Sequence, residues 1–315
     1  MPAITTHRLF AEESVERLPE GIVTSGDERT AFIIANQGPD PYFYRFRTPN
    51  FMNCMKLGHV MHNERMSRHF AALREGVERL PAEDAGVGRA FVLGVLSHYV
   101  LDRTAHPFIY DMQWGIQDAD PDLENAGSPV HAVIESDLDV LMLQIKRGGA
   151  TMADYPPAKE IPTTSHVNQV AGALMSSMAR TVYGLDIDVY EYGGAVADMQ
   201  LVYRLIEPNG APLNRFACFI DETFVEEYSL LDGLSHRITT ETPARTGNLD
   251  HLSWSNPFTG EASNESFPEI FDRALDDYEQ TARLFIETDD MTEVTHHLNY
   301  SGRPLDEDEE YDKEE

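Results

Sequence analysis

The stretch from Phe91 to Tyr110 reads FVLGVLSHYVLDRTAHPFIY, the most apolar run of the chain, yet it contains two histidines and an aspartate. Its apolar residues recur with a helical period, and Pro107 is typical of a helix end. In such a helix His98, Asp102 and His106 are spaced by four residues, so their side chains share one face. Polar groups on a buried helix face are costly unless they are hydrogen-bonded or bind a cation. The stretch therefore predicts a helical core and suggests a metal site.

A second apolar stretch repeats this pattern. It reads HAVIESDLDVLML, begins at His131 and places Glu135 one helical turn later. Composition alone predicts about two such pairs by chance among the chain's histidines. The chain contains two, so spacing by itself does not establish a metal. The apolar surroundings favour a metal, and the alternative is a metal-free helical scaffold in which these residues are paired polar groups of the core.

These two stretches resemble the zinc-dependent phospholipase C family. That family belongs with the S1/P1-type nucleases to an all-helical superfamily built around a trinuclear zinc cluster. Three upstream segments resemble it in the same order: THRLF from Thr6, NQGPDPYFY from Asn36 and LGHVMH from Leu57. The five motifs end at about Met142. A late segment, LSWSNPFTGEASNESFPEIFDRAL from Leu252, is similar to uncharacterised bacterial members, which are the closer match.

The resemblance implies an all-α, multi-helix bundle around a trinuclear zinc site. It also implies a zinc-dependent hydrolase of phosphoric esters, a phospholipase C-like phosphodiesterase that uses a zinc-bound water. Eight residues match the family's ligand positions. The first zinc would be held by Asp40, His62, His98 and Asp102, the second by His106, His131 and Glu135, and the third by His7 with a bridging Asp102.

Several of these positions have a plainer interpretation. His7 near a helix start could be a capping residue, and Asp40 between two prolines could belong to a turn. His59 is the alternative to His62. Asp40 is also the candidate general base, and Asp139 is a candidate hydrogen-bond acceptor behind the ligands.

The third zinc site departs from the family. Secreted members use a mature N-terminal tryptophan as a ligand, whereas Trp114 and Trp254 are both internal here. Removal of Met1 would leave the amine of Pro2, which a metal could deprotonate readily. The alternative is that water or a carboxylate fills the position, or that the site is partly empty.

Composition limits the partners. The chain has 315 residues, 42% of them hydrophobic, which is enough for a substantial core. Two cysteines exclude a disulfide framework and a thiolate zinc site. The net charge of -30 and the four lysines argue against long nucleic acids and anionic membranes. The expected partner is a small phosphoester or phospholipid head group, and the sequence indicates no oligomeric state.

The chain start lacks the basic residues and apolar core of a signal peptide, and no apolar run reaches the roughly 20 residues of a membrane span. A cytoplasmic location is expected. Residues 1–150 are expected to form a metal-site helical core and residues 151–303 a helical remainder packed on the same domain. Residues 304–315 are expected to form an acidic disordered tail.

Apolar periodicity predicts further helices. One runs from about Met55 to Leu80. The segment from Asp111 to Pro129, rich in Asp, Gly and Pro, is expected to be a loop that could cover the metal cluster or simply connect two helices. After a proline-rich linker, helices are predicted at Ser165–Tyr183, Glu191–Ile206, Pro212–Leu231 and Ser266–Glu287.

Two other functions remain open. The same zinc cluster could serve an S1/P1-type nuclease or nucleotidase, although the acidity of the chain disfavours long nucleic acids. A non-catalytic metal-binding or partner-binding helical protein is also compatible, since structural metal sites stabilise folds without turnover.

Overall fold

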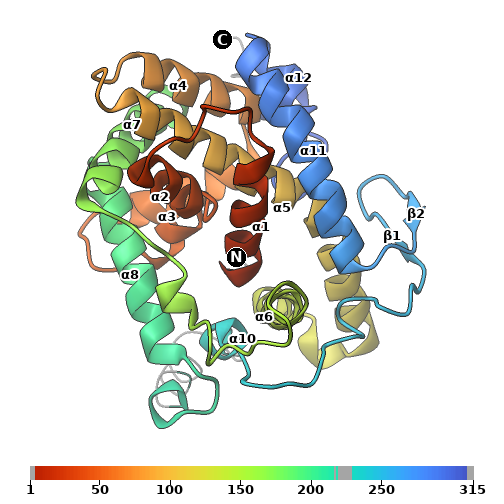
Figure 1. Ribbon diagram of the computed structural model, residues 1–315. Coiled ribbons are helices and arrows are strands. Elements are labelled where there is room, and N and C mark those ends of the chain that lie inside the picture. The colour runs from red at the N-terminus through yellow and green to blue at the C-terminus, as the bar shows by residue number, and fades with distance from the viewer. Residues whose placement is uncertain (1–3, 216–217, 219–228, 311–315) are drawn as a thin grey trace. The chain divides into compact units, whose positions relative to one another are not determined.

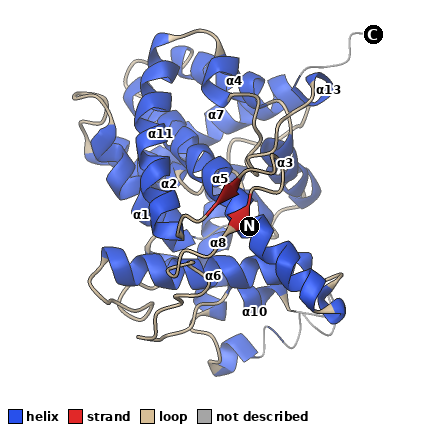
Figure 2. Ribbon diagram, turned by 90° about the vertical axis from the view of Figure 1, so that its right-hand side faces the viewer, coloured by secondary structure: helices blue, strands red, loops and turns tan. Residues whose placement is uncertain are grey.

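The computed structural model describes residues 4–215, 218 and 229–310, and nearly all of their regular structure is helical (Figure 2). The predicted all-α class is confirmed. In the described residues the strands are limited to a short antiparallel pair, β1 (Trp254–Ser255) and β2 (Ala262–Ser263). The helices are α1 (Ile4–Ser14), α2 (Gly26–Ala35), α3 (Phe51–Asn63), α4 (Met66–Glu78), α5 (Ala85–Ala119), α6 (Gly127–Lys146), α7 (Ser165–Tyr183), α8 (Glu191–Ile206), α10 (Leu230–Leu234), α11 (Phe267–Glu287), α12 (Met291–Thr295) and α13 (Glu307–Glu310).

The chain forms two compact units with interleaved segments. Within one unit α6 packs on α10, and within the other α4 and α7 lie side by side (Figure 1). The sequence-based division into residues 1–150, 151–303 and 304–315 remains a prediction. Unit 1 comprises Met1–Leu9, Ala105–Glu160 and Gln200–Asp272, and unit 2 comprises Phe10–Thr104, Ile161–Met199 and Arg273–Glu315.

Helix α5 continues through Pro107, so the predicted helix end there is wrong. Proline removes one helical hydrogen bond, but the neighbouring side chains of Ala105 and Phe108 are buried, and this burial offsets the loss. The stretch from Asp111 to Pro129, predicted as a loop, is consequently helical for most of its length. Only residues 120–126 connect α5 to α6.

The helix predicted from about Met55 to Leu80 is instead two helices, α3 and α4, separated at Arg65. The backbone of Arg65 is left-handed, with φ of 60°, a conformation that is costly for any residue other than glycine. Contacts within unit 2 stabilise the break. The Arg65 N–H donates to the Glu309 carbonyl at 2.9 Å, and the Tyr183 hydroxyl donates to the Glu64 carbonyl at 3.0 Å.

The later helices follow their local signals closely. Helix α7 has the predicted bounds because the Thr164 side chain accepts the Val167 N–H at its start. At its end Gly184 adopts φ of +64°, a conformation that suits glycine. Helix α8 also has the predicted bounds, and α11 begins one residue later than predicted. The helix predicted at Pro212–Leu231 lies partly outside the described residues.

Part of the stretch predicted as a disordered tail is helical. In α13 the Glu310 side chain is 1% exposed, and its carboxylate accepts the N–H groups of Ser67 at 2.8 Å and Met66 at 3.2 Å. These backbone donors in the first turn of α4 satisfy a buried negative charge. Residues 311–315 lie outside the described residues.

No helix in the described part of the chain is long and apolar enough to span a bilayer.

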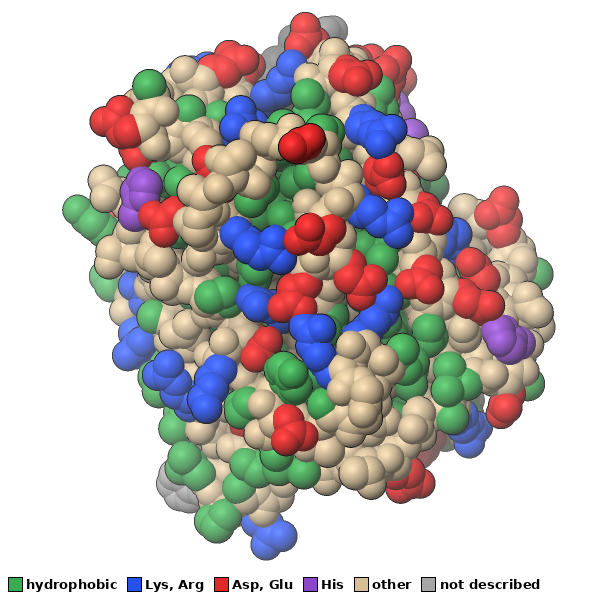
Figure 3. Space-filling model, viewed as in Figure 1, with side chains coloured by type: hydrophobic (Ala, Val, Ile, Leu, Met, Phe, Trp, Pro, Cys, Tyr) green, Lys and Arg blue, Asp and Glu red, His purple; other side chains and the backbone are tan. Residues whose placement is uncertain are grey.

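On the face shown in Figure 3, acidic side chains lie among basic ones. Apart from that view, in unit 2 the Arg17 guanidinium lies 3.1 Å from an Asp276 oxygen and 3.2 Å from a Glu279 oxygen. Exposed ion pairs of this kind contribute at most about 1 kcal/mol. The acidic side chains on this face are thus interspersed with basic ones.

Candidate metal centres

A glycine turn places Asp40 beside His98 in unit 2. Gly38 has φ of +51°, and a Cβ atom there would lie 2.3 Å from the His98 ring, so any other residue would clash. Pro39 and Pro41 restrict the backbone on either side of Asp40. The aspartate begins a short 3-10 turn (Asp40–Tyr44) and is only 1% exposed. The turn thus presents a buried carboxylate to an imidazole.

The four residues predicted to hold the first zinc lie together in unit 2. His62 Nε2 is 3.1 Å from Asp40 Oδ1, and His98 Nε2 is 3.6 Å from Asp40 Oδ2. His98 Nε2 is also 3.2 Å from Asp102 Oδ2, one turn later on α5. Potential ligand atoms of His62, His98 and Asp102 all lie within 4.8 Å of one another.

Backbone carbonyls determine which ring nitrogen of these histidines carries a proton. His98 Nδ1 lies 2.9 Å from the Asn36 carbonyl, and His62 Nδ1 lies 2.7 Å from the Gly58 carbonyl. Because a carbonyl only accepts, Nδ1 is the donor, and Nε2 of the neutral ring has a lone pair. That lone pair faces carboxylate oxygens, an arrangement that is repulsive unless a proton or a metal cation lies between them.

The electrostatics of this group also favour a bound cation. Burial alone would lower the pKa of His98, but the charges of Asp102 and Asp40 raise it above its usual value. Burial would raise the pKa of Asp40, whereas His98 and His62 lower it. Apart from its contact with His62, Asp40 Oδ1 receives no hydrogen bond from any described residue. Nitrogen and carboxylate donors of this kind fit zinc.

A second group lies in unit 1, where α5 contributes His106 and α6 contributes His131 and Glu135. The Nε2 atoms of His131 and His106 are 3.2 Å and 3.6 Å from the same Glu135 oxygen, and all three side chains are buried. Their potential ligand atoms lie within 4.8 Å of one another. Gln113 Oε1 accepts from His131 Nδ1 at 2.8 Å. Burial lowers the pKa of His131 despite the opposing charge of Glu135, which favours the neutral, metal-binding ring.

The remaining candidates are His7, His59 and Pro2. His7 is buried on α1 in unit 1, whereas its expected partner Asp102 belongs to unit 2, so the third zinc site remains a proposal. His59 is exposed, and its ring lies 5.0 Å from that of Phe43. It belongs to none of the potential ligand groups in the described part of the chain. Pro2 lies outside the described residues.

Two neighbours of these groups were not predicted from the sequence. Gln113 falls in the stretch predicted as a loop, and only the continuation of α5 places it seven residues after His106, on the same helix face. The Tyr300 ring lies 4.9 Å from His62 and 5.6 Å from His98. The backbone N–H of Tyr300 donates to the His62 carbonyl at 3.2 Å. Burial raises the pKa of the Tyr300 hydroxyl well above its usual value. No local pattern indicates this contact.

Aromatic rings extend from the unit 1 group towards solvent. The Tyr110 ring lies 5.2 Å from His131 and 5.7 Å from His106. Trp114, which is 42% exposed, lies 5.5 Å from Tyr110. Phe258, between β1 and β2, lies 5.8 Å from Tyr110 and 6.0 Å from Trp114. The candidate metal ligands of unit 1 therefore adjoin a partly exposed aromatic surface.

An all-helical fold in which each unit contains a group of potential imidazole and carboxylate ligands defines a class of helical metalloprotein. The chain belongs to the zinc-dependent phospholipase C family, whose family model, described as zinc dependent phospholipase C, matches residues 6–204. This confirms the resemblance seen in the sequence, and the matched region contains all eight predicted ligands. No curated protein and no solved structure matches the chain. Membership supports a zinc-dependent phosphoester hydrolase in general.

Proposed function

We propose that the protein is a zinc-dependent phosphodiester hydrolase of the phospholipase C type. The observation that carries this proposal is the orientation of the histidines. In His62, His98 and His131 an oxygen acceptor holds Nδ1, and Nε2 faces a buried carboxylate. Oxygen and nitrogen donors without thiolate are typical of catalytic zinc. Membership of the family supports zinc as the metal.

Each ligand group has a defined role in this proposal. Zinc bound in these groups supplies a Lewis acid and lowers the pKa of water to near 7. The first zinc is assigned to Asp40, His62, His98 and Asp102, the second to His106, His131 and Glu135, and the third to His7 with Asp102.

Asp40 is the proposed general base. Despite burial, His98 and His62 lower its pKa, so the carboxylate is ionised near neutral pH and can accept a proton, although the lowered pKa makes it a weak base. The attacking water gives that proton to Asp40 as its oxygen bonds to phosphorus. The bond from phosphorus to the leaving oxygen then breaks, the leaving oxygen takes a proton from bulk water, and protonated Asp40 returns its proton to bulk water. The reaction consumes one water for each ester bond.

A nucleotidase is the second candidate, because the exposed ring of Trp114 and its neighbours could stack on a nucleotide base. The net charge of -30 still disfavours long nucleic acids. Assays with nucleotides and with phospholipid head-group esters separate the two candidates.

Protein purified without chelator is expected to contain about two to three zinc equivalents and to hydrolyse bis(p-nitrophenyl) phosphate. Elemental analysis and a chromogenic assay on the same sample measure both properties. Less than about one equivalent after zinc reconstitution would remove the mechanism. A fully metallated protein that is inactive on a panel of phosphodiesters and monoesters would instead indicate a non-catalytic metal-binding protein.

Trp114→Ala is expected to raise KM about tenfold for diesters with an aromatic substituent and to leave kcat nearly unchanged, because stacking on a ring contributes about 1–3 kcal/mol. Steady-state kinetics with aryl and methyl diesters measure the difference. Ile116→Ala is the control, because Ile116 is also an exposed apolar residue of α5. An equal increase in KM for the methyl diester would show that Trp114 does not bind the substituent.

A further inference from the structure

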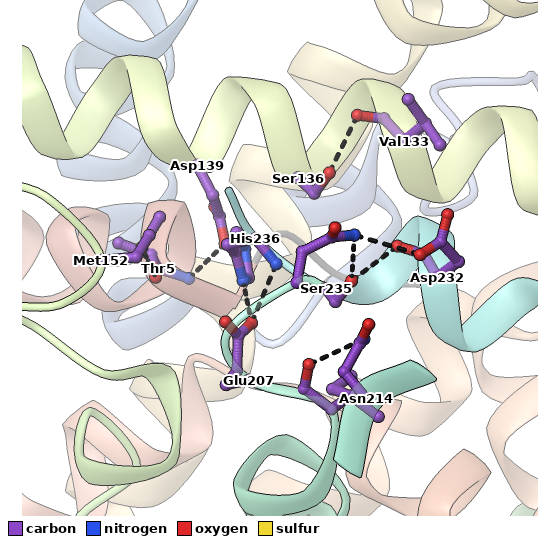
Figure 4. A network of polar contacts seen from close by, with 12 residues as sticks. Thr5, Val133, Ser136, Asp139, Met152, Glu207, Asn214, Asp232, Ser235 and His236 are labelled. Atoms are coloured by element: carbon purple, nitrogen blue, oxygen red, sulfur yellow. Dashed lines mark hydrogen bonds and ion pairs between the residues drawn. The ribbon is translucent and has the colours of Figure 1, made fainter. Parts of the chain in front are cut away.

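A buried histidine, His236, lies between two carboxylates in unit 1 (Figure 4). His236 is 2% exposed, and its Nε2 lies 3.0 Å from Asp139 Oδ2. Its Nδ1 lies 2.5 Å from Glu207 Oε1, which also accepts the His236 backbone N–H at 3.0 Å. Glu207 and His236 follow the region matched by the family, residues 6–204. The family match therefore gives no role to this pair.

The surroundings of His236 determine its charge. Both ring nitrogens face carboxylate oxygens, which only accept hydrogen bonds, so the ring donates twice and is an imidazolium. Burial would lower the pKa of His236, but the hydrogen bonds to Asp139 and Glu207 raise it to about 9. Neither nitrogen is left to take a proton from a nucleophile. His236 is therefore unsuited to general base catalysis.

Asp139 also caps the start of α1. Its Oδ2 accepts the Thr5 N–H at 2.8 Å (Figure 4). Its Oδ1 accepts the Thr6 N–H at 2.7 Å. N–H groups in the first turn of a helix have no partner within that helix, and the helix dipole favours a negative charge there. With these two donors and His236, both oxygens of Asp139 are engaged. Asp139 is thus a buried cap supplied by another helix, not an available metal ligand.

The capped turn includes a candidate ligand. His7 directly follows Thr6, and Asp139 lies one turn after Glu135 on α6. All four residues belong to unit 1. A single carboxylate therefore fixes the segment that carries His7 to the helix that carries Glu135.

We propose that Asp139, held in place by His236 and Glu207, is a positioning residue that orients His7 for metal binding. The inference rests on the proposed function, since His7 is a ligand only within it. The His236 imidazolium balances the charge of Glu207, and the charge of Asp139 is left to the backbone N–H donors of α1. A rigid helix start limits the freedom that His7 would lose on binding a metal.

Asp139→Asn tests this role in the full-length protein. An asparagine side chain has one acceptor oxygen and a donating amide, so it cannot accept both N–H groups of α1. We expect the affinity of the His7-dependent zinc to fall by about 10- to 100-fold, as for other groups that support metal ligands. Competition with a chelator, followed by counting the zinc retained, measures this affinity without an activity assay. The affinities of the other zinc ions should be unchanged.

Asp137→Asn is the matched control, because Asp137 lies on the same helix but pairs with Arg237 and Thr246 nearer the surface. It should leave all zinc affinities unchanged. His7→Ala defines which zinc depends on His7. If His7→Ala removes no zinc, the third site of the proposed function fails. If His7→Ala removes one zinc and Asp139→Asn retains the wild-type affinity, the positioning role is overturned.

A second variant covers the case in which Asp139→Asn does not fold. His236→Gln leaves in place the hydrogen bonds that Asp139 accepts from the backbone N–H groups of Thr5 and Thr6, but it removes the positive charge beside Asp139. We expect this variant to lose less zinc affinity than Asp139→Asn, and only at the His7-dependent zinc. Wild-type affinity for that zinc in a folded His236→Gln protein would overturn the role assigned to His236.

Discussion

Asp102→Ala is expected to lower kcat/KM for phosphodiester hydrolysis by more than about 100-fold, because changes to groups that merely support a ligand already cost about 10- to 100-fold. Asp102 is buried, and its Oδ2 lies 3.2 Å from His98 Nε2. In the proposed function Asp102 also bridges two zinc ions. Its removal would therefore weaken two sites at once. Steady-state kinetics and elemental analysis of the purified variant measure both effects.

Asp118→Ala is the control for this experiment, because Asp118 lies on the same helix, α5, and is exposed. It should retain wild-type activity and zinc content. An Asp102→Ala protein with full activity and full zinc content would show that Asp102 is not a ligand. Loss of activity with full zinc content would instead place Asp102 in contact with substrate.

Removal of zinc with a chelator is expected to lower Tm by about 10 °C. Free zinc at about 1,000 times its Kd stabilises the native state by about 4 kcal/mol, and in a large domain each kcal/mol shifts Tm by about 2–4 °C. In unit 1 the ligands come from α5 and α6, and in unit 2 they come from the Asp40 turn, α3 and α5. Without a cation, carboxylate and imidazole lone pairs in these groups repel one another. Thermal denaturation followed by circular dichroism measures the shift.

Re-addition of zinc should restore the higher Tm, which separates metal loss from damage by the chelator. The difference between chelated and zinc-loaded protein should be smaller for Asp102→Ala than for the wild type, because the variant has fewer ligands to lose. Identical melting curves for wild-type protein with and without chelator would contradict a stabilising metal.

The amino-acid sequence by itself determined the elements whose signals are local. Helices α7 and α8 begin and end where their apolar periods predicted, and the structure shows the Thr164 cap and Gly184 at the two ends of α7. The pairs His98 with Asp102 and His131 with Glu135 meet because a helix brings residues four apart onto one face. These pairs needed no knowledge of the tertiary fold, and together with the five ordered motifs they predicted the family.

The tertiary structure decided the features that depend on residues distant in sequence. Helix α5 continues through Pro107 because apolar burial offsets a lost hydrogen bond, and the chain breaks at Arg65 because contacts from elsewhere in unit 2 stabilise a costly backbone. The contact of Tyr300 with His62 and the cap that Asp139 provides to α1 are of the same kind. No periodic pattern in the sequence indicates such contacts, because they form only when segments distant in sequence pack together. The sequence therefore indicated the candidate ligands, while the structure showed which residues contact them.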